Sequence, residues 1–188
     1  MFPIGGVPVM LAGALASGVL AGLLALALRR RLGVLGAGAL AALLWSVVVI
    51  GLVTLLPAQG APGWVSAETR LDVCSTDIGG PAPDGFWIFS GGQRLLNTVI
   101  FLPSGVLAAV VAGRRPRLLP LTVPLAWALL AGYAVAIELT QLGLARLDRA
   151  CDVTDMIDNA TGAALGVGVG LVLLPVLRPW RGRRPPPG

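Results

Sequence analysis

Long uncharged apolar runs alternate with short polar segments along this chain. The runs predict helices at about 7–28, 34–56, 95–113, 118–142 and 154–177. Each is long enough for a helix to cross the hydrocarbon core of a bilayer, which takes about 20 residues. The charged residues lie between the runs, with Glu138 as the main exception. The pattern predicts an all-α membrane protein, a polytopic bundle of about five transmembrane helices.

These helices are expected to form one domain over residues 1–182. An outer loop at 57–93 separates the second helix from the third, and a Pro-rich tail at 183–188 is expected to be disordered. Hydrophobic residues make up 56% of the chain and charged residues only 12%. This composition excludes an ordinary soluble domain.

The arginines predict how the bundle is oriented. Arg29, Arg30 and Arg31 follow the first apolar run, and further clusters lie at 114–117 and 178–184. Short loops rich in arginine face the cytoplasm in most membrane proteins. Alternation of sides then places ten of the 14 arginines inside and all nine acidic residues outside. The N-terminus is therefore predicted outside and the C-terminus in the cytoplasm.

Nucleic acid is not an expected partner, although the net charge is +5. The arginines form short clusters at helix ends without interleaved aromatic residues, as membrane orientation produces. The chain also contains no histidine. This excludes a Ser-His-Asp or Cys-His catalyst and any zinc site that needs imidazole. No cofactor and no resident metal are expected.

The two cysteines, Cys74 and Cys151, fall on the same side of the membrane in this topology. That side is the outer one, where thiols meet an oxidising environment. A disulfide between them is therefore predicted, tying the outer loop to the stretch before the last helix. Closing a loop of that length stabilises by roughly 4 kcal/mol in the chain-entropy model. The alternative is two unrelated small residues.

Polar residues gather at the outer ends of the last three helices. On the third helix, Asn97 and Gly105 share one face because they are two four-residue steps apart. Pro103 is expected to kink that helix. On the fourth helix, Glu138 and Gln141 are three residues apart and therefore neighbours. A carboxylate about one turn inside the membrane boundary needs a partner.

The last helix carries a stripe that is polar at its outer end and small further in. Its members are Asp155, Asn159, Gly162, Gly166 and Gly170. Glycines let another helix approach closely, so the stripe is expected to face protein rather than lipid. Asp158 lies about 60° or more off this stripe by helix geometry. For Asp152 alone, capping of the helix N-terminus is the favoured explanation.

Three ordered blocks of these residues carry a resemblance to a known family. The blocks are 97–105 (NTVIFLPSG), 137–141 (IELTQ) and 149–162 (RACDVTDMIDNATG). In their order and spacing the chain resembles the VanZ-like family, bacterial membrane proteins named for a member linked to resistance against the glycopeptide teicoplanin. The likeness covers residues 97–170.

The resemblance implies a multi-pass protein of the bacterial plasma membrane. It also implies a functional set at matched positions: Asn97, Glu138, Gln141, Arg149, Asp152, Asp155 and Asn159. Asp158 stands where such proteins usually have an apolar residue. Two roles remain open for it, a functional charge or the solvation of an exposed helix face. The motif does not by itself reveal a biochemical activity.

The first functional hypothesis is a cell-envelope protein that binds an amphiphile at its outer face. The expected ligand is a lipid-linked wall precursor or a lipoglycopeptide, and such binding would contribute to glycopeptide (teicoplanin) resistance. Membrane lipids are the other expected partners. Arg149 would pair with a phosphate or carboxylate, while Asn97, Gln141 and Asn159 would supply neutral hydrogen bonds. The apolar bundle would accept the chain of the ligand.

The alternative is a membrane-embedded enzyme that acts on a polyprenyl- or lipid-linked substrate. Glu138, Asp152 and Asp155 would hold Mg²⁺ against a pyrophosphate, or act as acid and base on a lipid-linked sugar. Against this, the sequence has no dense metal motif, and acidic groups on two helices also form structural ion-pair networks. We expect Glu138, Arg149 and Asp155 to form such a network. A structural scaffold is the third alternative, in which the polar groups satisfy only one another.

Overall fold

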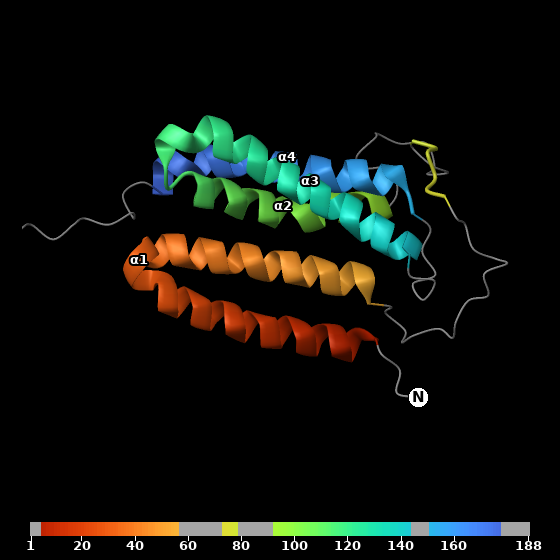
Figure 1. Ribbon diagram of the computed structural model, residues 1–188, viewed down its shortest axis with the longest axis horizontal. Helices are drawn as coiled ribbons and strands as arrows, with labels where there is room; N and C mark the ends of the chain where they lie inside the picture. Colours follow the sequence, from red (N-terminus) through yellow and green to blue (C-terminus); the bar gives the residue numbers. More distant parts are fainter. Residues whose placement is uncertain (1–4, 57–72, 79–91, 144–150, 178–188) are drawn as a thin grey trace, which may run out of the picture.

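Four α-helices and one short 3₁₀ helix make up most of the part of the chain that the structure, a computed structural model, describes. The described residues are 5–56, 73–78, 92–143 and 151–177. The elements are α1 Val7–Leu55, α2 Gly92–Ala112, η2 Pro116–Leu118, α3 Leu119–Gly143 and α4 Val153–Leu177. Figure 1 shows the helices side by side along one long axis. The predicted all-α class is confirmed.

α1 is a hairpin of two helical arms rather than one rod. Gly33 interrupts it with φ 73° and ψ 162°, a backbone conformation that is essentially reserved for glycine. In Figure 1 the two arms turn back on each other at one end of the molecule. The Trp45 indole Nε1 in the second arm donates to the Ala14 carbonyl in the first, at 2.9 Å. Five helical segments therefore run along the long axis, in agreement with the prediction of about five.

The surfaces of these helices are apolar, as a lipid environment requires. All four helices are long and apolar enough to cross a membrane. Large hydrophobic side chains point outward along them, including Leu15 at 72% exposed, Val34 at 81% and Val172 at 75%. In water such surfaces would drive aggregation, whereas lipid tails solvate them.

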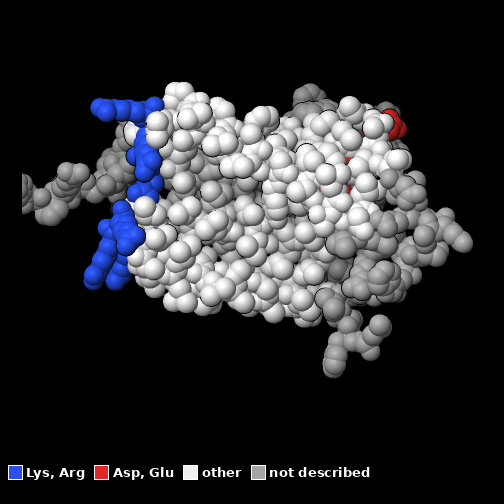
Figure 2. All heavy atoms as spheres, in the orientation of Figure 1, with Lys and Arg blue, Asp and Glu red and all other residues white. Residues whose placement is uncertain are grey.

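The charged residues divide between the two ends of the bundle (Figure 2). The arginines at the Gly33 turn and those between α2 and α3 lie together at one end. The described acidic residues belong to the other end, where α3 ends and α4 begins. This separation is the one that the predicted topology needs. Which end faces the cytoplasm stays a prediction.

α2 and α4 are parallel and pack backbone against backbone. A Cβ added at Gly162 would meet the Thr98 carbonyl oxygen, and one at Gly166 would meet the Leu102 carbonyl oxygen. At Gly170 the added Cβ would lie 2.7 Å from the Val106 carbonyl oxygen. The glycines of the predicted stripe thus lie at the closest helix contact of the bundle, where a larger residue does not fit.

The other helices join this pair through a small core and partly buried hydrogen bonds. Phe101 of α2 is fully buried, and its ring centroid lies 6.2 Å from that of Tyr133 in α3. The Tyr133 hydroxyl donates to the Val47 carbonyl of α1 at 2.9 Å. The hydroxyls of Ser46 in α1 and Ser104 in α2 are hydrogen-bonded at 2.9 Å. These contacts fix the positions of α1, α2 and α3 relative to one another.

Candidate functional site

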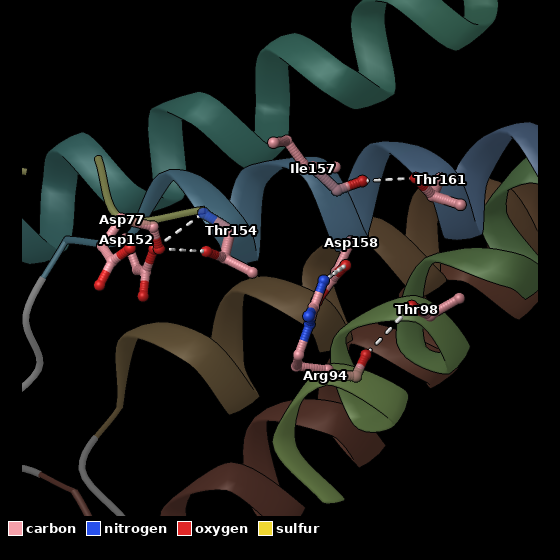
Figure 3. A network of polar contacts seen from close by, with 8 residues as sticks. All are labelled: Asp77, Arg94, Thr98, Asp152, Thr154, Ile157, Asp158 and Thr161. Carbon is pink, nitrogen blue, oxygen red and sulfur yellow. Dashed lines mark hydrogen bonds and ion pairs between the residues drawn. The ribbon is translucent and has the colours of Figure 1, made fainter. Parts of the chain in front are cut away.

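A buried ion pair joins the first turn of α2 to the second turn of α4 (Figure 3). Arg94 Nε donates to Asp158 Oδ2 at 2.8 Å, and Arg94 Nη2 donates to Oδ1 at 3.1 Å. The two side chains are only 9% and 1% exposed. This two-point geometry is the strongest way in which a guanidinium binds a carboxylate. The ion pair continues the parallel α2–α4 contact to its end.

The position of Asp158 corrects the sequence interpretation. Asp158 is fully buried, whereas Asp155, placed on the buried stripe by the sequence, is partly exposed. Asp158 precedes Gly162 by four residues and therefore continues the row of glycines on the same face. The interpretation of Asp158 as a charge that solvates an exposed helix face is wrong.

Glu138 connects the end of α3 to the start of α4. It is 3% exposed, and its Oε2 accepts the backbone N–H of Asp152 at 3.2 Å. Asp152 in turn uses its Oδ1 to accept the backbone N–H of Thr154 at 2.8 Å. That second bond satisfies one of the free N–H groups at a helix start. Asp152 thus has the capping contact that the sequence favoured for it.

Gln141 connects the same end of α3 to α1. Its Nε2 donates to the Thr54 carbonyl oxygen at 3.0 Å. Thr54 lies in the last turn of α1, where carbonyl groups have no partner within the helix. The side-chain amide of Gln141 therefore closes a helix end and is itself buried, at 5% exposed.

The predicted disulfide between Cys74 and Cys151 is confirmed, with the two Cα atoms 4.5 Å apart. Backbone hydrogen bonds flank it, from Ser75 N–H to the Cys151 carbonyl at 2.8 Å and from Val153 N–H to the Ser75 carbonyl at 3.0 Å. The Thr154 hydroxyl also donates to the Asp77 carbonyl at 3.3 Å. Residues 73–78 are thus fastened onto the start of α4, beside Asp152.

Two asparagines lie next to the ion pair with a buried polar atom that lacks a partner. These atoms are Asn97 Nδ2 in α2 and Asn159 Oδ1 in α4, and nothing in the described part of the chain hydrogen-bonds to either. Asn97 lies one turn beyond Arg94, and Asn159 directly follows Asp158. A buried polar group left without a hydrogen bond costs about 1–3 kcal/mol. The paired helices therefore hold one donor and one acceptor with unused bonding capacity.

Two further predictions concern the charge network around Arg149 and a metal site. Arg149 lies outside the described residues, so the expected network of Glu138, Arg149 and Asp155 stays a prediction. Among the residues that are described, no three Asp, Glu, Cys or His side chains lie close enough to hold a metal ion.

The sequence interpretation missed Arg94. The sequence places Arg94 at the very start of the third helix but assigns it no role or partner there, and α2 begins two residues earlier, at Gly92. The available signal was spacing, because Arg94 precedes Thr98 and Leu102 by four and eight residues. It therefore lies on the face that meets the glycines of α4.

A family model matches residues 43–174, from the second arm of α1 to the last turn of α4. The chain belongs to the VanZ/LLP1 family. The VanZ/LLP1 segment contains both cysteines, the Arg94–Asp158 pair and every residue of the predicted functional set. It omits the first arm of α1. Comparisons with curated proteins and with solved structures found no significant match to this VanZ/LLP1 protein.

Proposed function

We propose that this VanZ/LLP1 protein binds an amphiphile at the end of the bundle that carries the disulfide. Asn97 and Asn159 would hold the headgroup, and the apolar helix surfaces would accept the chain. The observation that carries the proposal is the pair of buried amide atoms, Asn97 Nδ2 and Asn159 Oδ1, without partners among the described residues. A ligand that bonds to both would remove the cost of leaving them unsatisfied.

The chemistry of this pair favours a neutral polar headgroup. Asn97 Nδ2 can donate to a carbonyl or hydroxyl oxygen, and Asn159 Oδ1 can accept from a hydroxyl or amide. Sugars and peptides carry such groups, and both occur in lipid-linked wall precursors and in lipoglycopeptides. Arg149, outside the described residues, would add a contact to phosphate or carboxylate.

The predicted orientation supports the same ligand class. The disulfide end would face the outside, where wall precursors and lipoglycopeptides meet the membrane. Binding of either would contribute to resistance against teicoplanin. The alternative is a membrane-embedded enzyme that uses Glu138, Asp152 and Asp155 as metal ligands or as acid and base. It receives less support, since Glu138 and Asp152 each bond to a backbone amide.

The test compares the stability of the empty protein with its response to ligand. Asn97→Leu and Asn159→Leu remove the unsatisfied polar groups and keep the number and branching of the side-chain heavy atoms. We expect each variant to unfold at the same or a higher temperature than the parent protein in detergent. We expect each to lose the thermal stabilisation given by a polyprenyl-linked wall precursor or by teicoplanin.

Thr140→Val is the matched control. Thr140 lies at the same end of α3, but its hydroxyl donates to the Ala136 carbonyl of its own helix, at 2.6 Å. This variant should keep the response to ligand. The proposal fails if neither compound stabilises the parent protein, or if both asparagine variants respond as the parent does.

A further inference from the structure

A cavity of about 500 Å³ lies at the arginine end of the bundle, between the second arm of α1, α2 and α3. This is the end opposite the disulfide. Its walls are apolar and include Leu40, Leu43, Ala108, Val111, Leu125 and Leu129. Leu125 and Leu129 are 54% and 66% exposed on the outside of α3. The cavity therefore reaches the surface that meets lipid tails.

Two arginines line the same cavity, Arg114 and Arg115. A Cβ added at Gly36 of α1 would lie 2.7 Å from Arg114 Nη1, so the guanidinium lies directly over this glycine. Arg114 thus reaches from the end of α2 across to α1. An arginine that served only to orient the protein would not need a specific contact with the backbone of another helix.

Neither guanidinium has a carboxylate to pair with in the described part of the chain. The ion pair seen there is Arg94–Asp158, at the opposite end. The described acidic residues, Asp77, Glu138, Asp152, Asp155 and Asp158, all belong to that opposite end. Figure 2 shows the arginine end without acidic side chains on the visible face. Within the described ranges, Arg114 and Arg115 therefore have no carboxylate in contact, and an anion from outside the protein could take that place.

We propose that this cavity binds one anionic phospholipid. The apolar walls accept an acyl chain, and Arg114 and Arg115 bind the phosphate at headgroup depth. Guanidinium binds phosphate through two parallel hydrogen bonds, and the low polarity of the surroundings strengthens the contact. The site is separate from the proposed headgroup site at Asn97 and Asn159, so either proposal stands without the other.

The experiment titrates the detergent-purified protein with dioleoylphosphatidylglycerol and counts retained lipids by native mass spectrometry. Dioleoylphosphatidylcholine, which has no net charge, and inorganic phosphate, which has no chain, serve as comparison ligands. We expect one phosphatidylglycerol to be retained in preference to phosphatidylcholine, and inorganic phosphate not to displace it. Displacement by inorganic phosphate at comparable concentration would show a simple anion site and overturn the proposal.

The double variant Arg114→Gln/Arg115→Gln tests the headgroup contact. At about 1 kcal/mol for each arginine near the membrane surface, the affinity should fall roughly 30-fold. The control is Arg29→Gln/Arg30→Gln, which removes the same charge at the same end from residues outside the cavity lining. If the affinity of the control variant for phosphatidylglycerol falls as far as that of the test variant, the arginines attract the lipid only through their general positive charge. The proposed site then does not exist.

Ala112→Phe tests the chain contact, because Ala112 lines the cavity and a larger side chain would fill it. Gly36→Ala provides a milder test, since the added methyl displaces the flexible end of Arg114 rather than any backbone. Both variants should lower phosphatidylglycerol retention. Retention at the parent level in a folded Ala112→Phe protein would place the lipid elsewhere.

Discussion

Arg94 and Asp158, 64 residues apart in the chain, meet through two hydrogen bonds at the start of two parallel helices. The same register repeats along the contact, where Thr98 lies against Gly162 and Leu102 against Gly166. The ion pair and the glycines therefore belong to one interface between α2 and α4. This interface is polar at its end and tightly packed further along the helices.

Replacing one member of the Arg94–Asp158 pair should destabilise the protein more than replacing both. Arg94→Gln or Asp158→Asn alone leaves a buried charge without its partner, which typically costs about 3–5 kcal/mol. The double variant should recover much of that loss. A double-mutant cycle on thermal unfolding measures the coupling. Additive losses would show that the two side chains do not interact.

Glycine substitutions in α4 should differ sharply by position. Gly166→Ala forces a methyl group against the Leu102 carbonyl and should cost about 1–3 kcal/mol or more. Gly168 in the same helix has open space around it, so Gly168→Ala should be neutral or stabilising. The unfolding temperatures of the two variants, compared with that of the parent protein, test this difference. Equal effects would place the α2–α4 contact elsewhere.

Removing the disulfide should loosen the end of the bundle that carries the asparagines. Cys74→Ser leaves residues 73–78 attached to α4 through hydrogen bonds alone. The loss should approach roughly 4 kcal/mol in the chain-entropy model. Reduction should shift the gel mobility of the parent protein but not of this variant. A parent protein with two alkylatable thiols before reduction would contradict the bridge.

Membrane orientation can be tested with single-cysteine reporters in a cysteine-free background. Reporters near Arg30 and Arg115 should react only from the cytoplasm, and one near Gly80 should react from outside. The expectation rests on the arginine clusters at one end of the bundle. If a reporter near Gly80 were labelled only from the cytoplasm, the predicted orientation would be inverted. The disulfide would then lie on the reducing side of the membrane.

The sequence predicted the spans because charged and apolar residues are cleanly separated along it. It also predicted the disulfide, since one topological rule placed both cysteines on the same side. The sequence did not predict that Asp158 is buried, because the helix face drawn through Asp155 and Asn159 passes beside it. The partner of Asp158 was beyond reach, because no local spacing reveals that α2 and α4 are parallel neighbours.

The 64-residue separation of Arg94 and Asp158 also sets an order of events during synthesis. Arg94 enters the membrane with α2 before the ribosome has made its counterion, and α3 must turn back before α4 can arrive. An arginine in a span opposes insertion by up to about 3 kcal/mol. We therefore expect chains that contain both residues to insert more stably than chains that end before Asp158. Nascent chains truncated before Asp158 should be degraded quickly in pulse-chase experiments, and Arg94→Gln should prolong their lifetime; equal lifetimes would contradict this expectation.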